Sequence, residues 1–241
     1  MKHTIKLLTA FFLIGFANIS FGQLYDFYIT QASNYLKQGN TERAIYYAEK
    51  AIEKDSLNFL GYYFKGVSYY DSKDLDRSLI YLEKAESLND SALVNLRMLA
   101  TVHDRLANFE YSLSYYEKYL KSDPNNLSVL SSKAWIECKL KKYDQALKTL
   151  NYAMDLDSNN IEVINVFGLY YENQKKYQQA REQYSKVINL DPNYASAYYN
   201  RCRMNNYLQN QEENCSDCKK AIELGIEDGA FFILNEKKCK K

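Results

Sequence analysis

The 241-residue chain carries 31 Lys and Arg against 30 Asp and Glu, so its net charge is close to zero. This balance gives no electrostatic reason to bind nucleic acid or an anionic membrane surface. With only two histidines, the sequence has almost no material for paired-histidine metal sites or catalytic relays.

The N-terminal segment 1–22 has the composition of a secretory signal peptide. Lys2 and Lys6 precede an uncharged run over 7–17, and small residues, Ser20 and Gly22, occupy the −3 and −1 positions before Gln23. The alternative is a membrane anchor, but this run is about half of the roughly 20 apolar residues that a spanning helix needs. We expect cleavage after Gly22, a periplasmic or secreted protein, and no integral membrane segment in the mature chain.

A turn pattern recurs at equal intervals along the rest of the chain. It is marked by the short polar residues Asp55, Asn89, Asp123, Asp157 and Asp191. A fixed period of about 20–50 residues indicates one supersecondary unit stacked repeatedly rather than a single globular core. Within 23–228, this period predicts six units, at 25–58, 59–92, 93–126, 127–160, 161–194 and 195–228.

Each unit has the pattern of two helices. In the unit 161–194, apolar residues at helical spacing mark a first helix from Ile164 to Tyr171 and a second from Ala180 to Ile188, with a polar turn between them. The eighth place is small in all units (Ala32, Gly66, Ala100, Ala134, Gly168, Cys202), and so is nearly every twentieth place (Ala44, Ser78, Ser112, Ala146, Ala180, Asn214). Two small columns allow two antiparallel helices to approach closely where they cross.

These columns, a large apolar fourth place, and the turns at Pro124 and Pro192 resemble the tetratricopeptide repeat family over 25–228. The resemblance implies an all-α fold, a right-handed α-solenoid of antiparallel helix hairpins (the tetratricopeptide superhelix). Units one and six depart most, with Gln31 and Arg201 where a Leu is usual. The apolar start of 229–241 predicts a short C-terminal capping helix before a basic tail.

By the same resemblance, the first helices line a concave groove. The residues expected to face it and bind a partner include Tyr63, Tyr70, Arg97, Arg105, Trp135, Tyr199, Arg203 and Tyr207. Aromatic and Arg side chains are enriched where proteins bind each other. The alternative is that a chain with 24 Tyr places Tyr on every face. Ile29 and Ser33 replace the Lys and Asn with which some family members grip a C-terminal carboxylate, which disfavours that clamp.

Four of the five cysteines lie near the C-terminus. In an exported chain, Cys202, Cys215, Cys218 and Cys239 are candidates for structural disulfides, with three connectivities open. The alternatives are a redox pair at Cys215 and Cys218, or a metal site, but neither has the expected sequence context. Cys138 is expected on the groove side as a free thiol. His103 is expected to be a packed imidazole.

The sequence therefore predicts a non-enzymatic scaffold that binds a protein or peptide segment in its groove, needs no cofactor or metal, and does not bind nucleic acid. Two alternatives stay open. One is a thiol-dependent redox or chaperone role centred on Cys202, Cys215 and Cys218. The other is an accessory subunit of an envelope complex that uses its convex face. The oligomeric state does not follow from the sequence.

Overall fold

The computed structural model describes residues 21–227, and within this range every regular element is an α-helix. Positions 1–20 of the expected signal peptide and the expected capping helix at 229–241 lie outside the described residues. The chain divides into two compact units, with the boundary between Asn108 and Phe109.

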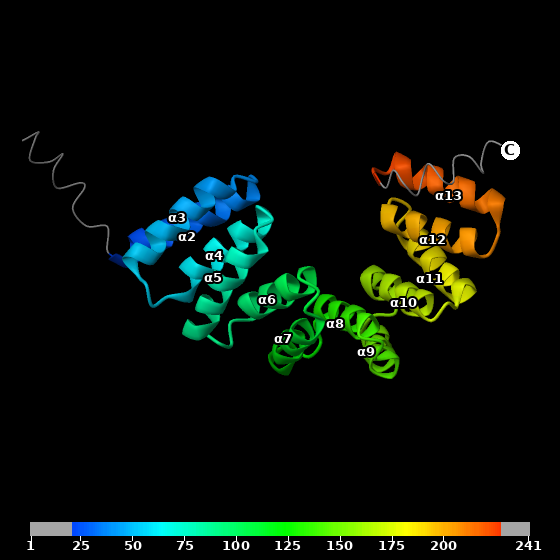
Figure 1. Cartoon of the computed structure of the whole chain (residues 1–241), viewed down its shortest axis with the longest axis horizontal. Coiled ribbons are helices and arrows are strands. Elements are labelled where there is room, and N and C mark those ends of the chain that lie inside the picture. Colours follow the sequence, from blue (N-terminus) through cyan, green and yellow to red (C-terminus); the bar gives the residue numbers. More distant parts are fainter. Residues whose placement is uncertain (1–20, 228–241) are drawn as a thin grey trace, which may run out of the picture. The chain divides into compact units, whose positions relative to one another are not determined.

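The N-terminal unit contains α2 (Phe21–Lys37), α3 (Thr41–Lys54), α4 (Phe59–Asp71), α5 (Leu75–Leu88) and α6 (Leu93–Arg105). The C-terminal unit contains α7 (Phe109–Ser122), α8 (Leu127–Lys139), α9 (Tyr143–Leu156), α10 (Ile161–Asn173), α11 (Tyr177–Leu190), α12 (Ala195–Tyr207) and α13 (Gln211–Glu223). Within each unit, helices that follow one another pack side by side (Figure 1). We call the even-numbered helices the first helices and the odd-numbered ones, from α3 on, the second helices.

Short polar side chains start many of these helices. The Asn58 carboxamide accepts a hydrogen bond from the Leu60 amide at 3.1 Å, and the Asp74 carboxylate accepts one from the Arg77 amide at 3.0 Å. Such caps satisfy amide groups that have no partner inside the helix. The side chains of Asn40, Asn126 and Asn160 cap α3, α8 and α10 in the same way.

A residue with positive φ follows each first helix, at the fifteenth place of every expected unit. Gly39 occupies this place once, with φ 71°, and the others are Lys73, Ala107, Lys141, Lys175 and Gln209, with φ between 58° and 65°. This left-handed residue ends the first helix and turns the chain toward the second. Since only one of the six is Gly, the turn conformation is not evident from composition.

The small columns lie where the helices of a pair cross. All six eighth-place residues are buried, as are the five twentieth-place residues whose side chains are described. A Cβ atom added to Gly66 would lie 2.7 Å from Cγ of Leu82, so α4 and α5 approach too closely there for any larger residue. The close helix approach expected from these columns is therefore present.

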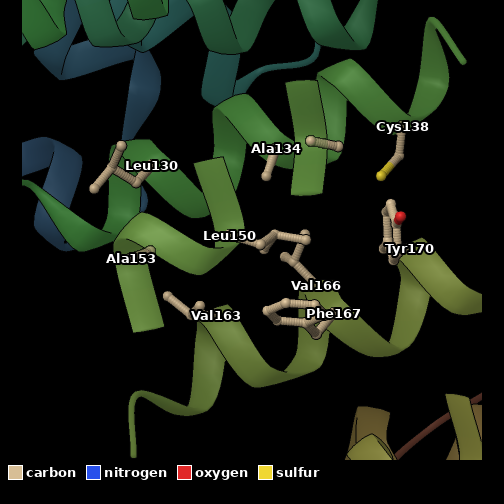
Figure 2. Close-up of a cluster of buried hydrophobic side chains, with 10 residues drawn as sticks. Leu130, Ala134, Cys138, Leu150, Ala153, Val163, Val166, Phe167 and Tyr170 are labelled. Atoms are coloured by element: carbon tan, nitrogen blue, oxygen red, sulfur yellow. The ribbon is translucent and has the colours of Figure 1, made fainter. Parts of the chain in front are cut away.

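A large buried apolar cluster of the C-terminal unit lies between α8, α9 and α10. Leu130, Leu150, Val163 and Phe167 form a continuous buried apolar cluster with their neighbours (Figure 2). Burying such side chains stabilises a fold by about 1.5–3 kcal/mol each. Helix α8 contacts both its partner α9 and the next first helix α10, so the apolar contact continues from one expected repeat to the next.

Three cations lie at the seventh place of alternate units, where the repeat pattern usually has an apolar residue. Lys65 pairs with Glu49 at 2.8 Å, Lys133 with Glu137 at 2.5 Å, and Arg201 with Asp217 at 2.6 Å. The Glu137 side chain is 1% exposed and that of Asp217 is 5% exposed. A buried charge is tolerated when an opposite charge neutralises it. The pairs of Lys133 and Arg201 therefore replace apolar contacts inside the helix packing, whereas the partner of Lys65, Glu49, is 48% exposed.

Candidate partner-binding face

In the N-terminal unit, four of the residues expected to bind a partner lie on two neighbouring first helices. Tyr63 and Tyr70 lie on α4, two helical turns apart, and Arg97 and Arg105 lie on α6. Helices α4 and α6 contact each other. Both tyrosines are partly exposed and both arginines are exposed, so the four side chains are accessible to a partner.

Each tyrosine in this group has an arginine beside it. The Arg105 Nε donates a hydrogen bond to the Tyr70 hydroxyl at 3.3 Å. Burial raises the pKa of the Tyr63 hydroxyl, and the positive charge of Arg97 opposes that rise. Next to Tyr70 and Arg105 is a cavity of about 370 Å³, which Asp71, Lys73 and Leu75 also line.

In the C-terminal unit, Trp135 is half-buried on α8. One side of its ring packs against the apolar cluster between α8 and α10, and the Lys139 ammonium group lies 4.0 Å from the ring centre. A cation at this distance is attracted to the electron-rich face of an indole. The ring is thus held by the chain and stays partly accessible.

The other three residues of this unit lie on α12, and two of them are bound to side chains from neighbouring helices. The Arg203 guanidinium pairs with the Glu172 carboxylate on α10 at 2.5 Å and lies 5.7 Å from the Tyr199 ring centre. The Tyr207 ring stacks on Tyr177 of α11, with centroids 4.4 Å apart. The sequence pattern singled out Arg203 and Tyr207, but it did not indicate that Glu172 and Tyr177 contact them.

Glu172 also accepts a hydrogen bond from the Tyr184 hydroxyl at 3.2 Å. Burial is the main cause of the raised pKa of Tyr184, and the Glu172 charge raises it further. The phenol therefore stays protonated. Its hydrogen bond fixes the position of the Glu172 carboxylate, which in turn pairs with Arg203. Glu172 stands at the twelfth place of its unit, a groove place that Tyr70 and Cys138 occupy in theirs, so the same pattern could have singled it out.

Comparison with known families agrees with the repeat pattern. The profile described as tetratricopeptide repeat matches residues 29–92, and the profile described as anaphase-promoting complex, cyclosome, subunit 3 matches residues 105–187. The chain belongs to the tetratricopeptide repeat family. No curated relative matches its sequence.

Solved structures of tetratricopeptide proteins share the fold. A tetratricopeptide repeat protein from Parabacteroides merdae is 15% identical, with a TM-score of 0.66 over 90% of this chain and 98% of its own. The pilF protein of Pseudomonas aeruginosa is 17% identical, with a TM-score of 0.70 over 92% and 99%. YrrB, described as a tetratricopeptide protein with an unusual peptide-binding site, is 25% identical, with a TM-score of 0.53 over 79% and 97%.

Cys138 is a free thiol, as expected, but it is not accessible from the groove. Cys138 lies at a groove place of its tetratricopeptide unit, but it is 1% exposed. Tyr170 on the next first helix, α10, covers it, and the two side chains face each other (Figure 2). Burial raises the pKa of the Cys138 thiol to about 12. His103 is 5% exposed and burial lowers its pKa, as expected of a packed imidazole.

The last described hairpin of the tetratricopeptide array is cross-linked. Cys202 on α12 and Cys218 on α13 form a disulfide, with Cα atoms 5.4 Å apart. Cys215 is also disulfide-bonded, and Cys239 lies outside the described residues. Because Cys218 is bonded to Cys202, Cys215 and Cys218 are not bonded to each other as a redox pair would be.

The Asp217 carboxylate beside this disulfide accepts hydrogen bonds from Arg201 at 2.6 and 2.8 Å and from Asn205 at 2.9 Å. Among residues 21–227, no group of three or more His, Cys, Asp or Glu is placed to hold a metal ion. None of the helices in that range is long and apolar enough to cross a membrane.

Proposed function

We propose that this tetratricopeptide protein is a non-enzymatic scaffold that binds a segment of another protein against its first helices. Members of the family bind protein or peptide partners, which makes this the favoured class of function. The observation that carries the proposal is that the side chains of all eight groove residues are at least partly exposed. None of them is buried, although their helices are packed on other sides.

The proposal includes export to the periplasm or the exterior. The basic and apolar character of the segment 1–22 supports it. The Cys202–Cys218 disulfide is a second support, since disulfides persist mainly in oxidising compartments. Sequencing the N-terminus of the protein recovered from its own cells tests this part, with Gln23 as the expected first residue.

Capture of partners by the mature chain tests the binding face. The chain is immobilised, exposed to an extract of its own compartment, and the captured proteins are identified by mass. The same capture is run with Trp135→Ala and Tyr199→Ala, which remove groove rings, and with Tyr152→Ala. Tyr152 is a matched control, because it is 44% exposed and lies on the second helix α9.

A partner bound as proposed is captured by the wild type and by Tyr152→Ala, and is reduced about tenfold or more by the groove substitutions. A partner that is captured equally by both groove variants but lost with Tyr152→Ala would instead support the convex-face alternative. No described contact favours the thiol-dependent alternative.

A further inference from the structure

The two units differ in how their groove cations are neutralised. In the C-terminal unit, Arg203 already pairs with Glu172. In the N-terminal unit, none of the described carboxylates lies within ion-pair distance of Arg97 or Arg105, and the side-chain hydrogen bond of Arg105 goes to the Tyr70 hydroxyl. Neither guanidinium therefore has an ion-pair partner in the described part of the chain, although the charge of Asp104 acts on Arg105 and Asp71 lines the cavity beside it.

We propose that this face binds an extended segment that carries two acidic side chains, one at Arg97 and one at Arg105. The proposal rests on the proposed function and names the chemistry of its partner. A guanidinium group binds a carboxylate through two parallel N–H donors. Arg105 uses its Nε on Tyr70, which orients the guanidinium and leaves its two terminal nitrogens for a ligand.

The surroundings of the two arginines fit such a segment. Each has a partly exposed Tyr beside it, from the neighbouring helix α4, which offers an apolar ring next to the charge. Asp71, Lys73 and Leu75 line the adjacent cavity, and Leu75 gives it an apolar part. The segment should therefore carry apolar or aromatic residues between its two acids.

The spacing of the arginines sets the spacing of the acids. They are eight residues apart on one helix, which is about 12 Å along the helix axis at a rise of 1.5 Å per residue, and roughly 80° apart around it at 3.6 residues per turn. An extended segment covers about 3.3 Å per residue, so its acids should be about four residues apart. An even spacing also places both acidic side chains on the same side of an extended segment.

The test begins with a random dodecapeptide library selected on the mature chain, followed by synthetic peptides with fluorescent labels. The designed peptide has two Glu four residues apart with Leu and Tyr between them, and its ends are acetylated and amidated. A second peptide has Gln in place of both Glu. Peptides with a free C-terminal carboxylate and no internal acid form a separate arm.

The protein variants are Arg97→Ala, Arg105→Ala and the control Arg43→Ala. Arg43 is a matched control, because it is also exposed and hydrogen-bonded to a Tyr hydroxyl, at 3.1 Å to Tyr35, but lies on the second helix α3. Circular dichroism and thermal melting confirm that each variant folds. A reversed pair, Arg97→Glu with Arg105→Glu, should bind the peptide in which Lys replaces both Glu.

We expect selected peptides to be enriched in acid pairs and the designed peptide to bind about tenfold or more tightly than its Gln form. Either Ala substitution, at Arg97 or at Arg105, should weaken that preference by removing one of the two contacts, while Arg43→Ala keeps it. Equal binding of the Glu and Gln peptides, or binding only to a free C-terminus, would overturn the inference. The capture experiment separates the two proposals. If the acidic peptides fail in this way but Trp135→Ala still loses the captured partner, the scaffold function stands and only the acidic-segment inference fails.

Discussion

The Tyr184 ring lies directly against Gly168, so that a Cβ atom at Gly168 would lie 2.7 Å from Cζ of the ring. Tyr184 is fully buried, and its hydroxyl reaches Glu172, the carboxylate that pairs with Arg203. A glycine on α10 thus allows a second-helix side chain to pass through the packing and support the first-helix face.

We therefore predict that Gly168→Ala lowers the free energy of unfolding by about 1–3 kcal/mol, because the added methyl group overpacks a rigid ring. Urea unfolding followed by circular dichroism measures the change. The companion substitution Tyr184→Leu makes room beside position 168. Together the two substitutions should cost less than the sum of their separate effects. Simple additivity would mean that the ring does not limit this position.

The disulfide in the last described hairpin should contribute measurably to stability. Cys202 and Cys218 are 16 residues apart, and cross-linking a loop of about this length stabilises a fold by roughly 3 kcal/mol. Replacing both with Ala should lower the free energy of unfolding by about 2–3 kcal/mol. Hydrogen exchange should quicken mainly in α12 and α13. Unchanged exchange in these helices would show that their packing alone holds them.

The thiol of Cys138 should be inert in the folded protein. Its pKa is raised to about 12 by burial, so the reactive thiolate is scarce at neutral pH, and Tyr170 covers the sulfur. A thiol reagent such as Ellman's reagent should react with Cys138 only after denaturant is added. The Cys138→Ala variant is the control and should give no such signal. Rapid reaction in the native state would restore the expectation of a groove thiol.

His103 should make stability depend on pH. Burial lowers its pKa below the ordinary 6.5, although Glu86 opposes part of that change. The unfolded chain then takes up a proton at a higher pH than the folded chain. The neutral imidazole therefore contributes to the free energy of unfolding in full above pH 6.5. This contribution is lost as the pH falls from 6.5 to the lowered pKa of the folded chain.

We predict that the free energy of unfolding falls more steeply between about pH 7 and about pH 5 in the wild type than in His103→Asn, whose side chain does not titrate there. Urea unfolding at a series of pH values measures both slopes. Parallel slopes would show that the His103 pKa is the same in the folded and unfolded chains.

The repeat pattern was enough to predict the fold, because small columns and helical spacing are properties of single residues at fixed places. The buried position of Cys138 was not accessible in this way, since it depends on Tyr170 from the next repeat. The left-handed turn at Lys175 could not be predicted either, because lysine has no preference for positive φ. The ion pair between Arg203 and Glu172 also joins two repeats, whereas the pattern describes one repeat at a time.

The most direct test of the central claim is hydroxyl-radical footprinting of the mature chain with and without a captured partner. Tyr and Trp rings oxidise readily, and this chain has accessible rings on both sets of helices. The scaffold proposal predicts that the partner protects first-helix rings from oxidation and leaves second-helix rings unchanged. The first-helix rings are Tyr63, Trp135 and Tyr199, and the second-helix rings are Tyr46, Tyr111 and Tyr152. Protection confined to the second set would contradict binding on the first helices.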